Sequence, residues 1–514
     1  MNPPVITSFI NGSSVPGTAG TFTSVNPAVL TDVVAEVSLA SADQLVDAFR
    51  AAQAAQRAWA DTPAPVRGRV IAQVGRLVEA NKQALAELVT REVGKPMAES
   101  LGEVQEIVDT SDFFLGEGRR LYGQTVPSEM RDKQLFTFRV PVGVAGIITA
   151  GNFPVAVPSW YLVPALLCGN AVVWKPADYS AALGDALTKL FVAGGVPAGV
   201  LNTVHADGPT TFEGLTLALE AGLVQKVGFT GSTEVGSQIG ALCGKHLQTP
   251  CLELGGKNPL VVMPDADLDL AAEGALFSGF GTAGQRCTSL GVAIVHEDVH
   301  DAFLAKLLER LDAAAVGDPT QPVLYGPMLS ERFYQGFEKW LGEVAPHQTV
   351  HGPTGRITSA NPRPGFVGDP DVGVYAHPTV VSGVTMDDAL YRNETFGPLV
   401  SVMRFSTFDE ACTMANAHGY GLSSAIYTSN PRHVWDFRSR VSAGMLSVNN
   451  STSGAEAHLP FGGNGKSGNG SRQSGVWVLD QFTRWQSMNW DYAGKLQKAQ
   501  MDTEESAADL DFRL

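Results

Sequence analysis

The sequence has 514 residues, of which 44% are hydrophobic and 17% are charged, as is typical of folded globular proteins. A single hydrophobic core rarely grows beyond about 250–300 residues, so the length indicates two or three domains. The formal net charge of −16 argues against nucleic acid and against an anionic membrane as partners, because both repel an acidic surface.

Cysteine usage and the N-terminus indicate the compartment. The chain has five cysteines: Cys168, Cys243, Cys251, Cys287 and Cys412. They form no CxxC pair, which argues against a disulfide framework and against a zinc site. The first residues, Met-Asn-Pro-Pro-Val-Ile-Thr, contain neither a basic region nor an apolar core, so no signal peptide is expected. The sequence therefore predicts a protein of the reducing cytoplasm, without a bound metal.

The first long segment, residues 42–122, predicts helices, because apolar side chains recur at three- and four-residue steps, as at Val104, Ile107 and Val108. The stretch between Arg139 and Lys175 then contains no charged residue. A membrane span needs about 20 continuous apolar helical residues. Four prolines interrupt this stretch, so we interpret it as buried strand, turn and helix.

From residue 142 onward, short β-branched runs alternate with helical stretches, which predicts βαβ units on parallel sheets. In the first set, strands are expected at 142–148, 171–174, 226–229 and 259–263, with helices at 157–168, 180–195, 211–223 and 233–245. In the second set, strands are expected near 291–296, 399–405, 423–427 and 444–449, with helices near 299–315, 407–418 and 431–441. The chain is therefore expected to form two α/β lobes.

Two polar residues of the first lobe are candidates for a catalytic role. Asn152 comes directly after the first strand, where its amide could donate to a developing oxyanion, or could simply cap the next helix. Glu253 lies among apolar residues and precedes two glycines. Apolar surroundings raise a carboxyl pKa, which suits a general base, although a buried Glu could equally hold a turn.

Cys287 is the candidate nucleophile. It stands in Phe280-Gly-Thr-Ala-Gly-Gln-Arg-Cys-Thr-Ser289, where small residues leave room for a substrate beside the thiol. A thiolate attacks carbonyl carbons well and forms covalent intermediates. The alternative is an inert core cysteine, because free Cys is often buried.

The first lobe lacks the GxGxxG fingerprint of dinucleotide-binding domains. Instead, Gly231-Ser232-Thr233-Glu234 opens a helix directly after a strand. The free backbone N–H groups and the dipole of such a helix favour a phosphate. This turn is therefore the expected phosphate site of a dinucleotide.

Seven motifs stand in order along residues 20–490: Gly-Asn-Phe-Pro (151–154), Trp-Lys-Pro (174–176), Phe-Thr-Gly-Ser-Thr-Glu-Val-Gly (229–236), Leu-Glu-Leu-Gly-Gly-Lys (252–257), Gly-Gln-Arg-Cys (284–287), Glu-Thr-Phe-Gly-Pro (394–398) and Pro-Phe-Gly-Gly (460–463). Together they resemble the aldehyde dehydrogenase superfamily. The resemblance implies an α/β fold with a Rossmann-type NAD-binding domain (1–122 and 143–254), an α/β catalytic domain (255–470), a small β oligomerisation flap (123–142 and 471–494) and an acidic C-terminal tail (495–514).

The resemblance also implies which residues bind the cofactor. The matching positions are Ile148, Thr149, Lys175, Asp178, Gly231, Ser232, Glu394 and Phe396. Lys175 and Asp178 would hold the adenosine ribose, and a carboxylate there should repel a 2′-phosphate. NAD is therefore the expected cofactor, with NADP as the alternative, because Asp is shorter than the Glu commonly found at this position.

The implied reaction is the oxidation of an aldehyde to a carboxylic acid. Cys287 attacks the aldehyde carbon, the Asn152 amide and the Cys287 N–H stabilise the oxyanion, and Glu253 activates water to hydrolyse the thioester. One alternative is acyl transfer to coenzyme A, but enzymes of that branch usually lack the Glu. Another is an inactive structural member of the fold, which the presence of all three residues disfavours.

Four segments, 102–109, 126–129, 152–157 and 452–456, resemble the antiquitin branch, which oxidises α-aminoadipate semialdehyde. In that branch, residues matching Glu106 and Arg286 hold the substrate's ammonium and carboxylate. The other expected substrate residues are Trp160, Gly454 and Ala455. The sequence departs from the branch after Glu456 and at residues 158–159, which leaves other amino- or carboxyl-bearing semialdehydes, and general aliphatic or aromatic aldehydes, as alternatives. Glu106 could also be a solvated helix residue.

Residues 123–142 and 476–490 resemble the family's oligomerisation flap, in which strands pair across subunits. The second segment contains three Trp, a residue type enriched at interfaces. A homodimer or a homotetramer is therefore expected. Residues 491–514 extend past the usual end of the family and finish with acidic residues, as disordered tails often do.

Overall fold

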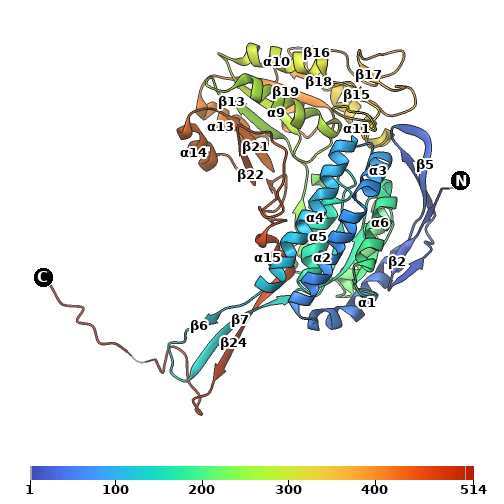
Figure 1. The fold of residues 1–514 in the computed structure, drawn as a ribbon. Coiled ribbons are helices and arrows are strands. Elements are labelled where there is room, and N and C mark those ends of the chain that lie inside the picture. The colour runs from blue at the N-terminus through green and yellow to red at the C-terminus, as the bar shows by residue number, and fades with distance from the viewer. Residues whose placement is uncertain (1–2, 504) are drawn as a thin grey trace.

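The computed structural model describes residues 3–503 and 505–514, and over these residues the chain forms two seven-stranded sheets and a projecting β arm (Figure 1). The two sheets lie in separate lobes, and the arm extends away from both. The expected α/β class is confirmed. Within the described residues, no helix is long and apolar enough to cross a membrane.

The first sheet has the order β12-β11-β8-β9-β10-β2-β3, and its first five strands run parallel: Cys251–Glu253, Lys226–Thr230, Val144–Ile148, Ala171–Lys175 and Leu201–Thr203. Strands β2 (Ser8–Ile10) and β3 (Ser13–Val15) extend it antiparallel. Along the chain, β9 and β10 are added on one side of β8, and β11 and β12 are then added on the other side. In such open sheets ligands bind outside the carboxyl ends of the strands where the order reverses, here between β8 and β11.

Helices cover both faces of this sheet. One layer contains α2 (Ala64–Ala80), α3 (Lys82–Val93), α4 (Met97–Arg120), α5 (Ala156–Leu167) and α6 (Ala181–Ala193), and the other contains α1 (Ala42–Asp61), α7 (Gly208–Glu220) and α8 (Thr233–Lys245). Every residue of α5 is buried, because the helix is apolar on all sides. Helix α7 begins three residues before the expected 211–223, since Asp207 caps it by accepting from the Thr210 N–H at 2.8 Å.

The second sheet has the order β16-β18-β19-β14-β13-β21-β22. Its strands are Thr349–His351, Thr379–Ser382, Leu399–Phe405, Leu290–His296, Asn258–Val262, Ser423–Tyr427 and Met445–Val448. The helices of this lobe include the expected α10 (His300–Ala313), α13 (Phe408–Ala417) and α14 (Pro431–Arg440), and also α9 (Leu268–Phe280), α11 (Glu331–Leu341) and the short α12 (Ala389–Arg392). The sequence patterns did not predict α9 or α11.

Smaller elements complete the fold. The N-terminal segment adds a sheet of β1 (Val5–Ile6), β5 (Val29–Ser38) and β4 (Thr21–Asn26), and two short pairs are β15–β17 (Val316–Gly317, Phe366–Val367) and β20–β23 (Tyr420–Gly421, Asn464–Gly465). The arm pairs β24 (Thr483–Asp491), which follows α15 (Leu479–Phe482), with β7 (Lys133–Pro141), and β7 with β6 (Thr125–Val126). The described residues of the tail, 495–503 and 505–514, contain neither helix nor strand.

A buried ion pair joins α4 to the start of α5. The Lys95 ammonium and the Glu103 carboxylate are both inaccessible to solvent, and the ammonium lies 3.3 Å from the centre of the Phe153 ring. The second Glu103 oxygen accepts from the backbone N–H groups of Val155 (2.8 Å) and Ala156 (3.2 Å). Glu103 thus caps α5 and fixes the turn that precedes this helix.

We expect Lys95→Met to destabilise the first lobe by about 3–5 kcal/mol, because it leaves the Glu103 charge buried without its partner. Urea unfolding followed by tryptophan fluorescence measures this loss. The matched control is Lys189→Met, which removes an exposed pair with Asp185 and should cost less than about 1 kcal/mol. Equal losses in the two variants would contradict a stabilising role for the buried pair.

Candidate active site

A groove of about 800 Å³ opens at the carboxyl ends of β8, β9 and β11. All eight expected cofactor residues line it: Ile148, Thr149, Lys175, Asp178, Gly231, Ser232, Glu394 and Phe396. Asn152 and Cys287 line the same groove. Residues from both lobes therefore meet at the predicted edge of the first sheet.

The groove suits a dinucleotide at two points. Ser232 is the N-cap of α8 and accepts from the Val235 N–H. The other N–H groups of the first turn have no intrahelical acceptors and can bind a phosphate. At the other end, Glu394 accepts from the Gly256 N–H at 3.1 Å, and a Cβ on Gly255 would come within 1.8 Å of the Glu394 carboxylate. Burial raises the pKa of Glu394 to about 7.

Four further lining residues were not predicted from the sequence: Tyr179, Phe212, Arg332 and Phe333. The Phe333 ring lies between two others, with its centre 5.2 Å from that of Tyr179 and 5.8 Å from that of Phe396. An aromatic series thus runs along the groove. Arg332 and Phe333 belong to α11, and because that helix was not expected, no pattern in the sequence placed them here.

The nucleophile sits after a strained turn. Helix α9 ends at Phe280, and the next turn has three successive residues with left-handed backbone, Thr282 (φ 52°), Ala283 (φ 52°) and Gly284 (φ 67°). A Cβ on Gly284 would lie 2.1 Å from the Gly397 carbonyl oxygen, so only glycine fits. Non-glycine residues in this region cost about 1–2 kcal/mol each, so other contacts must hold the turn that presents Cys287.

Glu99 of α4 provides those contacts. Its carboxylate accepts from the Thr282 N–H (3.3 Å), from the Thr282 hydroxyl and from Arg286 Nη2 (2.6 Å). Arg286 also lies over the Phe277 ring at 4.5 Å and is 7% exposed. Burial acts to raise the pKa of Glu99, but the Arg286 charge and the hydrogen bonds outweigh burial and lower this pKa.

Two amides fix the backbone on either side of the nucleophile. Asn152 Nδ2 donates to the Gln285 carbonyl at 2.8 Å, and the second hydrogen of this amide stays available for a substrate oxygen. Asn258 Nδ2 donates to the carbonyls of Cys287 (2.8 Å) and Ser289 (2.7 Å). The sequence predicted Asn152 but not Asn258, whose motif offered no signal for this contact.

Glu253 ends β12 and is 3% exposed. One carboxylate oxygen accepts from the Gly463 N–H at 3.2 Å, and among the described residues the other oxygen has no hydrogen-bond partner. Burial raises the pKa of Glu253 well above its usual value, against the opposing effects of the Arg472 charge and the Gly463 N–H. An unpartnered, protonatable oxygen in an apolar site suits a general base.

Cys287 is half-buried, and burial together with the charges of Glu253 and Glu394 raises its pKa to about 12. The thiol is therefore protonated at neutral pH in the free protein. The Glu253 carboxyl is therefore near enough to Cys287 for its charge to affect the thiol. A base that takes the thiol proton is needed before attack.

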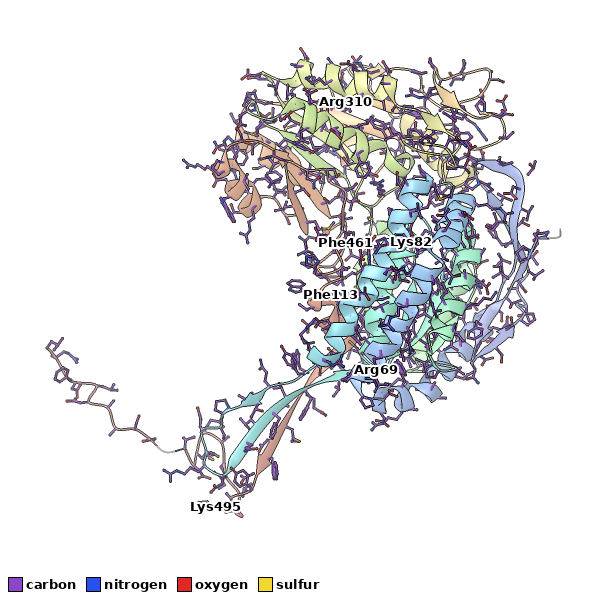
Figure 2. The ribbon with its side chains drawn as sticks, in the orientation of Figure 1. Arg69, Lys82, Phe113, Arg310, Phe461 and Lys495 are labelled. Atoms are coloured by element: carbon purple, nitrogen blue, oxygen red, sulfur yellow. The ribbon has the colours of Figure 1, made fainter. Side chains whose placement is uncertain are left out.

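A second cavity, of about 430 Å³, lies between α4 and the loop 455–458. Three acidic residues line it, Glu106, Asp109 and Glu456, together with the expected Ala455. Figure 2 shows Phe113, another lining residue, on the same side of the helix layer as Phe461. Arg286 and Gly454, which were also expected to bind substrate, do not line this cavity.

Glu106 faces this cavity with an uncompensated carboxyl. Among the described residues, neither its Oε1 atom nor the indole N–H of the nearby Trp160 completes a hydrogen bond. Burial and then the Glu103 charge raise the pKa of Glu106 to about 8. The Trp160 ring packs against Phe461, with centres 4.6 Å apart. The Lys95 charge and the Trp160 N–H act to lower the pKa of Glu106, so the indole and the carboxyl lie close enough to interact at this cavity.

The loop that carries Ala455 also contacts the turn of the nucleophile. Thr452 Oγ1 donates to the carbonyl of Thr288, the residue after Cys287, at 2.8 Å. Gly454 is exposed and has a φ of 136°, which favours glycine. The loop therefore connects the acidic cavity with the thiol.

The model of the aldehyde dehydrogenase family matches residues 15–488 of the chain. The alpha-ketoglutarate semialdehyde dehydrogenase of Haloferax volcanii is 37% identical over 92% of this chain and 97% of that protein. The alpha-aminoadipic semialdehyde dehydrogenase of Bos taurus is 35% identical over 91% of this chain and 85% of that protein. The crystal structure of an NAD-dependent aldehyde dehydrogenase from Sinorhizobium meliloti superposes with a TM-score of 0.89 at 32% identity, covering 96% of each chain.

The position of Arg286 differs from the expectation that it grips a substrate carboxylate, because Glu99 already neutralises it. We expect Arg286→Ala to lower kcat about 100-fold for neutral and acidic aldehydes alike, since the turn before Cys287 loses its clamp. Steady-state assays with hexanal and succinic semialdehyde measure this. Arg310→Ala, on the exposed surface of the second lobe (Figure 2), is the control. A rise in KM confined to the acidic aldehyde would restore the original expectation.

Proposed function

The chain belongs to the aldehyde dehydrogenase family, and from this premise we propose that Cys287, Asn152 and Glu253 carry out its chemistry on an amino-bearing semialdehyde. The chain is an NAD(P)-dependent aldehyde dehydrogenase, which oxidises an aldehyde to a carboxylic acid. The observation that carries the proposal is that Cys287 and Asn152 line the groove that all eight expected cofactor residues share. The roles of these residues follow from their contacts.

In the first step, the Cys287 thiol loses its proton to solvent and the sulfur attacks the aldehyde carbon. The oxyanion that forms accepts from the free Asn152 N–H and from the Cys287 backbone N–H. A dinucleotide held in the groove by residues such as Lys175, Ser232 and Glu394 would supply the acceptor for the hydride that leaves the aldehyde carbon. The acyl group then remains on Cys287 as a thioester.

In the second step, Glu253 takes a proton from water, and the resulting hydroxide attacks the thioester. The acid leaves, and Cys287 regains a proton. Burial supports this role, because a carboxyl with a raised pKa accepts a proton more readily at neutral pH. The presence of Glu253 also favours hydrolysis over acyl transfer to coenzyme A. The presence of Cys287, Asn152 and Glu253 together argues against an inactive structural protein.

We expect Glu253→Gln to form the thioester and then stall. Such a variant should release about one equivalent of reduced cofactor per active site in a burst. Its steady-state turnover should fall about 10²–10⁴-fold, because the base is lost. Stopped-flow absorbance at 340 nm measures both phases.

The exposed Glu220 at the end of α7 offers a control, Glu220→Gln, which should behave as the wild type. Loss of the burst itself in Glu253→Gln would show that Glu253 acts before the thioester forms. Product formation that depends on added coenzyme A would overturn the hydrolytic assignment.

The charges around the second cavity support a substrate whose far end bears an ammonium group. Glu106, Asp109 and Glu456 line the cavity, and the nearby cations Lys95 and Arg286 are bound by Glu103 and Glu99. An acidic cavity attracts an ammonium group and repels a lone carboxylate. Such an aldehyde is α-aminoadipate semialdehyde, on which the bovine relative acts by its name. General aliphatic or aromatic aldehydes are the alternative.

We expect Glu106→Gln to lower kcat/KM for α-aminoadipate semialdehyde about tenfold or more and to leave hexanal unchanged, because a charge-assisted hydrogen bond is lost. The Glu106 carboxyl is uncharged below its pKa of about 8 and charged above it. In the wild type, kcat/KM for the amino substrate should therefore rise as pH increases through about 8. Glu106→Gln should abolish that rise.

Asp112→Asn, on the exposed side of the same helix, is the matched control and should keep both the activity and the pH profile of the wild type. Equal losses with hexanal and the amino substrate would contradict the role of Glu106. A preference of the wild type for hexanal or benzaldehyde would favour the general alternative.

The arm supports a homodimer or a homotetramer. Strand β24 lies at the edge of its sheet, and beyond Thr483 its side chains are exposed, including Trp485 and Trp490. An edge strand with free backbone groups can pair with a second copy. All five cysteines are free, which supports a reducing location such as the cytoplasm.

A further inference from the structure

One end of the groove carries more positive charge than the sequence indicated. Lys175 ends β9, and Arg332 begins α11 of the other lobe, yet both line the groove beside Asp178 and Tyr179. From the sequence, only Lys175 and Asp178 were expected here. We call these four residues the cation end of the groove.

Aromatic contacts hold Arg332 over this end. Its guanidinium lies 6.0 Å from the centre of the Tyr179 ring and 5.3 Å from that of Phe333. The Tyr179 hydroxyl accepts from the Gly151 N–H at 3.2 Å, and the Tyr179 ring packs edge-on against Phe333. The ring beneath the guanidinium is therefore fixed, and the cation–π contact directs Arg332 toward the groove.

The two carboxylates of this region each accept a backbone hydrogen bond, and neither pairs with Arg332. Asp178 accepts from the Tyr179 N–H at 3.2 Å, and Asp207 accepts from the Thr210 N–H at 2.8 Å as the cap of α7. Within the described part of the chain, no carboxylate lies within 4 Å of the Arg332 guanidinium. Burial lowers the pKa of Lys175, the charges of Asp178 and Asp207 oppose this, and the weaker effect of the Arg332 charge lowers the pKa further, so the two cations also act on each other. A dianion between them would relieve this repulsion.

We propose that Arg332 and Lys175 together bind the 2′-phosphate of NADP, so that the enzyme accepts NADP as well as NAD, and that Arg332 sets the ratio between them. This inference rests on the proposed binding of a dinucleotide in the groove. The expected preference for NAD was argued from Asp178 and Lys175, one carboxylate and one cation. The proposal corrects that expectation by adding Arg332, a second cation at the same end of the groove. A guanidinium suits a phosphate because it donates two parallel hydrogen bonds.

The test compares Arg332→Gln with the wild type in turnover and in binding without turnover. We expect kcat/KM with NADP to fall about tenfold or more, and with NAD to change less than about twofold, because only the phosphate loses a charged partner. Calorimetric titration should show the Kd for adenosine 2′,5′-bisphosphate rising by a similar factor, while that for adenosine 5′-monophosphate stays nearly constant. Arg332→Lys should recover part of both losses.

The control is Arg69→Gln, on the exposed face of α2 at the far end of the helix layer (Figure 2), which should match the wild type. Equal losses with NAD and NADP in Arg332→Gln would overturn the inference, since Arg332 would then only pack on Tyr179. A wild type that binds the 2′,5′-bisphosphate no better than the monophosphate would overturn it too. Absence of NAD-dependent turnover in the wild type would instead contradict the proposed function.

Discussion

The catalytic geometry depends on the buried carboxylates of one helix. Glu99, Glu103 and Glu106 lie on α4 at spacings of four and three residues, so they share one face. Glu99 binds the turn before the nucleophile, and Glu103 caps the helix that follows Asn152. A single helix therefore sets the relative positions of Cys287 and of Asn152, the proposed oxyanion donor, which belong to different lobes.

This arrangement places the charged carboxylates of α4 at sites where removal of a charge from water costs free energy. A buried carboxylate is tolerated only with a partner, and α4 receives one in Lys95 for Glu103 and one in Arg286 for Glu99. The pair at Glu99 also opposes the strain of the left-handed run that begins at Thr282, because three of its hydrogen bonds end there or at Arg286. The ion pairs thus fix the position of the turn before Cys287 and of the start of α5.

The nucleophile is uncharged in the free protein. Burial raises the pKa of Cys287 to about 12, so the thiol is protonated at neutral pH, and burial also raises the pKa of Glu253. Negative charge then appears only as the reaction proceeds, at the oxygen that Asn152 can reach. In a dry site such a donor acts strongly, because no water competes with it. The acidic cavity at Glu106 lies apart from this centre and can select a substrate without changing the charge on the thiol.

The sequence by itself determined the class of the fold. Apolar runs and their periodicity follow from local packing, so the parallel strands and most helices lie close to the expected ranges. Of the three residues proposed for catalysis, Asn152 and Cys287 line the groove, and Glu253 ends β12. What only the tertiary structure decided is how charges pair over long distances. Glu99 lies 187 residues from Arg286, and Arg332 reaches Tyr179 from the other lobe. A local pattern gives the charge of a side chain but not its partner, and the partner decides whether that charge binds a ligand or holds a turn.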